Sequence, residues 1–185
     1  MSQSNCADSG CERLYPLREN PATACPKERR LRLLVLGVGN ILLTDDGVGV
    51  HAVNALRKKP PAGVLVTEVG TALLDAVPLL CWSDRVLVID ALFGQEPPGT
   101  LYFASFSEIL HKEGSLSLHE LDLSAALAFM PRGAPKPEIF VLGVQPRCFE
   151  VGLELSSEVA AAIPKIERYV RAKLIEWKRE RRPNV

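Results

Sequence analysis

Four side chains of this sequence have the types and positions for metal chemistry: Asp45, Asp46, Asp90 and His119. Asp45 and Asp46 form an acidic pair in a glycine-containing loop, Asp90 ends an apolar run, and His119 lies in Ser-Leu-His-Glu-Leu. Two carboxylates and an imidazole form a ligand set suited to Ni(II) or Zn(II) rather than to a soft, thiolate-bound metal. Three such ligands would leave coordination positions open for water or for a substrate group.

Each of these residues also has a structural alternative. Asp45 or Asp46 could cap the helix that follows them, and Asp90 could be a capping or loop acid. A single loop histidine such as His119 is more often structural or solvated than functional. The other two histidines, His51 on the first predicted helix and His111 in a polar loop, are expected to have no functional role.

The loop at residues 37–49 (Gly-Val-Gly-Asn-Ile-Leu-Leu-Thr-Asp-Asp-Gly-Val-Gly) is a poor phosphate-binding loop. A dinucleotide-binding fingerprint would need glycine where this chain has Leu42, and the Gly-Lys-Ser/Thr ending of a P-loop is missing. The acidic pair would repel phosphate and attract cations. The loop therefore favours a cation over a nucleotide.

Hydrophobic patterning predicts strands that alternate with helices. Near-continuous aliphatic runs indicate strands covered on both faces, and a weakly alternating run after Pro97-Pro98-Gly99 indicates an edge strand. This order predicts a three-layer α/β/α sandwich with a mostly parallel, twisted sheet of about five strands. Ligands bind such sheets beyond the carboxyl ends of the strands, here the loops after Val38, Ile89 and Val144. The predicted strands are Leu31–Val38, Val64–Val69, Arg85–Ala91, Thr100–Phe106 and Glu138–Val144. The first predicted helix starts at Asp46, and the other three are Ala72–Trp82 (with Pro78 inside), Glu120–Met130 and Ser156–Arg181.

Length and composition predict one domain over residues 31–185, preceded by a flexible tail over residues 1–30. Lys+Arg and Asp+Glu number 22 each, which argues against binding to nucleic acid or to an anionic membrane. Five cysteines without a Cys-x-x-Cys pair suit a reducing compartment. With no secretory signal and no apolar run long enough to span a bilayer, we expect a soluble, cytoplasmic protein.

Four segments in order along the chain resemble the hydrogenase maturation endopeptidases. They are Leu-Val-Leu-Gly-Val-Gly-Asn-Ile-Leu-Leu-Thr-Asp-Asp-Gly-Val-Gly, Val-Leu-Val-Ile-Asp-Ala, Ser-Leu-His-Glu-Leu and Leu-Gly-Val-Gln-Pro followed by Gly-Leu-Glu-Leu-Ser. The likeness covers about residues 31–175 and leaves out the cysteine-bearing tail. It implies the same fold as the patterning, of the phosphorylase/hydrolase type.

The resemblance implies a peptidase, classed as aspartic-type in this family, that removes a C-terminal extension from a nickel–iron hydrogenase large subunit once nickel is inserted. The family's metal contacts fall on Asp46, Asp90 and His119, where Asp46 is one C–C bond shorter than the glutamate that some members carry. The nickel would be borne by the substrate, with zinc or cadmium as substitutes in the isolated protein. The partner is then the large-subunit precursor, and we expect the protein itself to be a monomer.

The mechanism and two competing functions stay open. A carboxylate of Asp46, Asp90 or Asp45 could act as the general base, or the metal could polarise the carbonyl and activate water. A non-catalytic, nickel-dependent binding module or chaperone could use the same ligands. A thiol enzyme could instead pair Cys148 with His119, with Arg147 lowering the pKa of the thiol.

Overall fold

The computed structural model describes residues 30–110 and 120–180. In these ranges it contains a five-stranded sheet with strand order β2-β1-β3-β5-β4, in which only β4 is antiparallel to its neighbour. The strands are β1 (Leu33–Val38), β2 (Val64–Gly70), β3 (Arg85–Ala91), β4 (Leu101–Ser105) and β5 (Glu138–Val144). The mostly parallel sheet and the edge position of β4 are as the sequence predicts.

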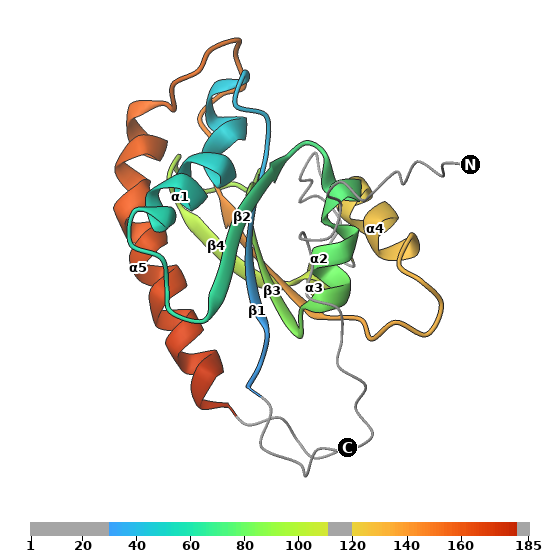
Figure 1. Cartoon of the computed structure of the whole chain (residues 1–185). Helices are drawn as coiled ribbons and strands as arrows, with labels where there is room; N and C mark the ends of the chain where they lie inside the picture. The colour runs from blue at the N-terminus through green and yellow to red at the C-terminus, as the bar shows by residue number, and fades with distance from the viewer. Residues whose placement is uncertain (1–29, 111–119, 181–185) are drawn as a thin grey trace, which may run out of the picture.

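Helices cover both faces of the sheet, which gives three layers (Figure 1). One layer holds α1 (Val48–Arg57) and the long α5 (Ser157–Arg179). The other holds the 3₁₀ helix η2 (Leu73–Ala76), α2 (Val77–Trp82), α3 (Phe106–Leu110) and α4 (Glu120–Ala128). No helix in the described ranges is both long and apolar enough to cross a bilayer.

Strand side chains alternate between two hydrophobic cores, as the period of two in a strand requires. Leu33 and Val35 of β1 pack in the core under α1 and α5, whereas Leu34 and Leu36 pack in the core under α2 and α4. All six residues of β1 are buried. Burying a Leu, Val or Ile side chain stabilises a fold by about 1.5–3 kcal/mol, so these continuous apolar runs fix the sheet in the middle of the molecule.

Two of the predicted helices begin differently in the structure. The first helical segment opens with a 3₁₀ turn, η1 (Thr44–Gly47), and becomes α-helical only at Val48. The segment predicted as one helix around Pro78 is η2 followed by α2, and Pro78 lies in the first turn of α2. A proline is tolerated there because the N–H groups of a first turn have no intrahelical partner.

The predicted N-terminal tail lies almost wholly outside the described residues, which start at residue 30.

Candidate functional site

The turn that carries Asp46 lies against the carboxyl ends of β1 and β3. A Cβ atom on Gly49, in the first turn of α1, would lie 2.2 Å from the carbonyl oxygen of Ile89 and 2.3 Å from that of Val38. Only glycine allows the helix to start this close to the two strands. The sequence therefore places η1, and Asp46 within it, directly over the strand ends where the parallel-sheet rule locates a site.

Asp46 is buried, with 2% of its surface exposed. Its Oδ2 accepts a hydrogen bond of 2.8 Å from the backbone N–H of Asn40. Gly39, with φ of +122°, makes the close approach possible, because a Cβ atom there would lie 1.8 Å from the carbonyl oxygen of Asp46. The glycines of the first motif thus fold the loop back onto the carboxylate.

Asp90 follows Ile89 in β3 and is also buried, with 3% of its surface exposed. Its Oδ1 accepts a 2.8 Å hydrogen bond from the N–H of Ala91. Val86 and Val88 of the same strand face the core under α2 and α4, so strand alternation directs Asp90 toward that layer as well. Helix α4, which starts at Glu120, belongs to the same layer.

The structure thus brings Asp46 and Asp90 to the same end of the sheet, as the sequence predicts. His119, the third predicted metal contact, lies outside the described residues, as does His111. Within residues 30–110 and 120–180, no group of three His, Cys, Asp or Glu side chains is close enough together to hold a metal ion. The meeting of all three predicted ligands therefore stays a prediction.

Asp45 points away from its neighbour and binds the segment after β5. The carboxylate is fully buried and accepts hydrogen bonds from the N–H of Ser156 (2.7 Å), the hydroxyl of Ser156 (2.8 Å), the N–H of Arg147 (2.8 Å) and the N–H of Cys148 (3.4 Å). These donors lie 102–111 residues away along the chain. Asp45 therefore joins the loop after β1 to the loop after β5.

The helix-cap alternative for the acidic pair is wrong. The N-cap of α1 is Gly47, and neither η1 nor α1 has a side-chain hydrogen bond at its N-cap. The 3₁₀ turn explains the error, because it places both aspartates inside the first helical residues instead of before them.

Thr44 makes a second connection between the same two loops. Its hydroxyl donates to the carbonyl of Cys148 and accepts from the N–H of Glu150, both at 3.1 Å, and its N–H donates to the carbonyl of Gly152 at 2.9 Å. Leu42 accepts a 3.0 Å bond from the N–H of Gly152. Thr44 has a φ of +42°, the one described non-glycine residue with a positive φ, and such strain persists where surrounding bonds impose it.

The loop after β3 is held by Gln145, which the sequence analysis did not single out. Its Oε1 accepts hydrogen bonds from the N–H of Gly94 (2.7 Å) and from the hydroxyl of Tyr102 (2.8 Å). Gln145 is buried, and it belongs to the Leu-Gly-Val-Gln-Pro segment. That segment thus fixes the loop that leaves Asp90.

The structure weakens the reasoning behind the thiol hypothesis. The guanidinium of Arg147 donates to both carboxylate oxygens of Glu158 at 2.9 and 3.2 Å. The cation that this hypothesis assigns to Cys148 therefore has a carboxylate partner on α5.

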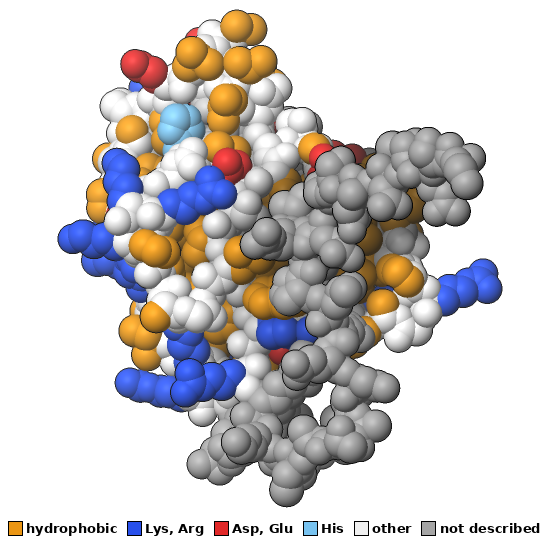
Figure 2. Space-filling model, viewed as in Figure 1, with side chains coloured by type: hydrophobic (Ala, Val, Ile, Leu, Met, Phe, Trp, Pro, Cys, Tyr) orange, Lys and Arg blue, Asp and Glu red, His pale blue; other side chains and the backbone are white. Residues whose placement is uncertain are grey.

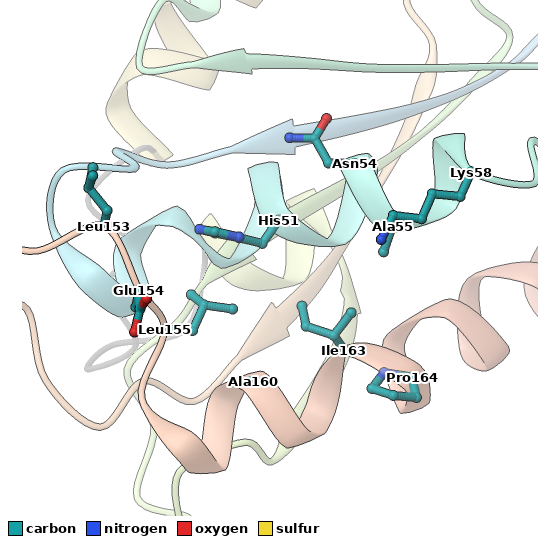
Figure 3. A pocket seen from close by; sticks show the side chains of 10 residues that line it. All are labelled: His51, Asn54, Ala55, Lys58, Leu153, Glu154, Leu155, Ala160, Ile163 and Pro164. Carbon is teal, nitrogen blue, oxygen red and sulfur yellow. The ribbon is translucent and has the colours of Figure 1, made fainter.

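An open groove of about 600 Å³ lies between α1 and α5, on the face of the sheet opposite to Asp90. Figure 3 shows His51 and Asn54 of α1, with Lys58 directly after it, on one wall. Ile163 and Pro164 of α5 form the other wall, and Leu153–Leu155 lie at one end. His51 lies on the first helix as predicted. Its Nε2 is buried without a hydrogen-bond partner among the described residues.

The geometry gives this edge of the sheet two kinds of carboxylate. Asp45 is occupied by four donors and cannot reach solvent. Asp46 and Asp90 lie beside strand ends with carboxylate oxygens of the type that bind Ni(II) or Zn(II). Together with one imidazole, they could contact a divalent ion and leave positions on it for other ligands.

A family model described as hydrogenase maturation protease matches residues 50–173. The hydrogenase 2 maturation protease of Escherichia coli K12 is 32% identical over 148 residues, which cover 77% of this chain and 90% of that protein. The hydrogenase expression/formation protein HupD of Rhizobium leguminosarum bv. viciae is 35% identical over 171 residues, covering 88% and 80%.

Solved structures of similar proteins have the same fold. The hydrogenase-maturating endopeptidase HybD from E. coli superposes with a TM-score of 0.69 at 31% identity, covering 79% of this chain and 93% of that one. The [NiFe] hydrogenase maturation protease HybD from Thermococcus kodakarensis gives a TM-score of 0.67 at 31% identity, covering 78% and 99%.

Proposed function

The chain belongs to the hydrogenase maturation protease family, and from that premise we propose that it removes the C-terminal extension of a nickel–iron hydrogenase large-subunit precursor after nickel insertion. In this proposal Asp46, Asp90 and His119 contact the nickel of the substrate. The ion identifies a correctly loaded precursor and positions the scissile bond.

The observation that carries the proposal is the common location of Asp46 and Asp90. Both carboxylates are buried at the carboxyl end of the sheet, and they come from η1 and β3, two elements that pack together. Asp90 faces the layer of α4, the helix that starts at the residue after His119. Secondary structure therefore supports a site built from these three positions.

The chemistry of the donors fits nickel. Carboxylate oxygen and imidazole nitrogen are suitable ligands for Ni(II), and three such groups leave room for the ligands that a substrate-bound ion already has. Affinity for the precursor then depends on the presence of the ion, which is specificity through differential binding. Zinc or cadmium would occupy the same contacts in the isolated protein.

Among the three acids, Asp45 is the least suited to act as a base. Four hydrogen bonds from the loop after β5 already occupy its two carboxylate oxygens. We assign it the role of positioning the loop that carries Asp46. Proton transfer in an aspartic-type reaction would fall to Asp46 or Asp90, and a positioned base of this kind is worth about 10²–10⁴-fold in rate.

The test offers the full chain two matched precursors, one with inserted nickel and one without, with free nickel chelated. We expect mass spectrometry to show loss of the C-terminal extension from the nickel-loaded precursor alone. Cleavage of the nickel-free precursor at a comparable rate would remove nickel as the recognition element. A stable complex with the loaded precursor but no mass loss would favour the binding-module alternative.

A further inference from the structure

Four large apolar side chains are exposed on the two loops that Thr44 and Asp45 join. Ile41 and Leu42 follow β1, with 45% and 57% of their surfaces exposed, and Val151 and Leu153 follow β5, with 92% and 62%. We call these four residues the apolar ridge. Figure 2 shows hydrophobic side chains gathered at the top of the view, where these loops lie in Figure 1.

The ridge has a fixed shape. Leu43 and Gly152 form a parallel β-bridge, the N–H of Gly152 donates to Leu42, and Thr44 and Asp45 add their bonds on either side of it. Strained backbone such as that of Thr44 clusters at ligand-binding and switch regions. Exposed apolar clusters of this kind mark protein interaction sites, and a preformed surface loses less conformational entropy on binding.

We infer that the apolar ridge is the docking surface for the hydrogenase large-subunit precursor, an inference that rests on the proposed function. Leu42 and Asp46 are separated by three residues, so a protein seated on the ridge is brought directly to the turn that carries Asp46. The ridge lies over the α1 and α5 side of the sheet, while Asp90 faces the α2 and α4 side. The precursor would therefore contact one side of the sheet edge and present its nickel to the other.

Charge around the ridge indicates the chemistry of the matching surface. Glu150 and Glu154 are exposed beside Val151 and Leu153, whereas Arg147 is bonded to Glu158. The complementary surface on the precursor is then an apolar patch rimmed by lysine or arginine. Such rim charges act mainly on association rate and salt dependence, and the apolar centre supplies most of the affinity.

The decisive variants are Val151→Asp and Leu42→Asp in the full chain, assayed with nickel-loaded precursor over a range of concentrations. We expect KM to rise at least about tenfold, which is 1.4 kcal/mol of lost binding, because the new carboxylate must be desolvated against an apolar partner. The kcat should stay within about twofold, since the chemistry at Asp46 and Asp90 is unchanged. Val151→Met, which keeps an apolar side chain, should retain the parental KM.

Phe129→Asp is the matched control. Phe129 is 69% exposed, follows α4, and lies on the segment that leads to the amino end of β5, far from the ridge. It should leave KM and kcat unchanged. The double variant Glu150→Lys with Glu154→Lys should raise KM at low salt and lose this effect at high salt; a lower KM would overturn the basic rim.

Several outcomes separate this inference from the proposed function. A parental KM in both aspartate variants, with cleavage intact, would overturn the ridge while the function stands. If the parent cuts no precursor, the proposed function fails. The ridge can then still be tested by titrating nickel-loaded precursor against the labelled chain and comparing the affinity of the parent with that of the two aspartate variants. Self-association of the parent that Val151→Asp abolishes, or a large fall in Tm for that variant, would assign the ridge to a second copy or to this chain's own residues and overturn the inference.

Discussion

Acidic side chains have different partners at the two ends of the sheet. At the amino end, Asp84 binds the N–H and the guanidinium of Arg32, at 2.8 and 2.9 Å, and Arg85 pairs with Glu138 and Glu180. At the carboxyl end, Asp45 takes its hydrogen bonds from three backbone amides and one serine hydroxyl. An arginine neutralises a carboxylate, whereas an amide satisfies its lone pairs and leaves the charge in place.

The amino end shows what a purely structural solution looks like. Burial of the Arg85 guanidinium by itself lowers the pKa, but hydrogen bonds to Glu180 and Glu138 outweigh burial and the pKa of Arg85 is raised. The same guanidinium lies 5.6 Å from the ring centre of Trp177. These ion pairs connect β3, β5 and the end of α5, and each of the three acids at this end of the sheet has an arginine partner. At the carboxyl end, the donors to Asp45 are neutral amides and a hydroxyl, so they add no positive charge there.

The largest effect should come from removing the charge of Asp90 or Asp46. Asp90→Asn and Asp46→Asn keep the size of the side chain but lose a metal contact and a possible base, so kcat/KM should fall by at least about 100-fold. Thermal unfolding should show a nearly unchanged Tm, since the amide oxygen can still accept from Ala91 or Asn40. Full processing by Asp90→Asn would disprove the site assignment.

The second effect is smaller: substitution of Asp45 by alanine should lower Tm more than the same substitution of Asp84. Asp45→Ala leaves three amides and a hydroxyl, which are part-buried, without their acceptor, and the loss of these four hydrogen bonds should cost about 3 kcal/mol. At 2–4 °C per kcal/mol for a domain of this size, Tm should fall by roughly 6–12 °C. Differential scanning calorimetry of Asp45→Ala and of Asp84→Ala measures this difference.

Asp84→Ala is the control at the other end of the sheet. The Arg32 side chain is 17% exposed and can recover hydrogen bonds with water, so the loss should be about 1–2 kcal/mol, and processing should continue at the parental rate. Equal destabilisation by the two substitutions would mean that the donors of Asp45 stabilise the fold no more than the Arg32–Asp84 pair does.

The sequence predicted the strands better than the turns. The limits predicted for Arg85–Ala91 and Glu138–Val144 are those of β3 and β5, because a short aliphatic run bounded by polar residues has few alternatives in an α/β fold. The edge position of β4 also followed from its weak alternation. The two 3₁₀ turns were missed, because apolar spacing over four residues does not distinguish three from 3.6 residues per turn.

The candidate site was predicted in part, and the limit is physical. A carboxylate at the end of a buried strand, such as Asp90, is visible in the sequence because the strand and its polarity are local. The role of Asp45 is not, because its donors Arg147, Cys148 and Ser156 reach it only through the parallel pairing of β1, β3 and β5. No local signal distinguishes Asp45 from Asp46, and tertiary structure alone assigns them different partners.

The smallest predicted effect concerns Glu158, the acid at the carboxyl end that does pair with an arginine. A hydrogen bond from the Ser157 hydroxyl, then one from its own backbone N–H, lowers the pKa of Glu158 from its usual 4.5, and Arg147 adds to this. A lowered pKa means that the ionised form favours the fold. Its contribution is present above pH 4.5 and is lost as the pH falls through the lower pKa of the folded state.

Because Glu158 is exposed, Glu158→Gln should lower Tm at pH 7 by no more than about 2 °C. The difference from the parent should shrink as the pH falls below 4.5 and through the lowered pKa of folded Glu158, and it should also shrink in high salt at pH 7. Thermal melts of the two proteins at pH 7, 5 and 3 measure this. A difference in Tm that persists at pH 3 would show that the glutamine disturbs the start of α5 itself. The Arg147–Glu158 ion pair would then make no separate contribution to stability.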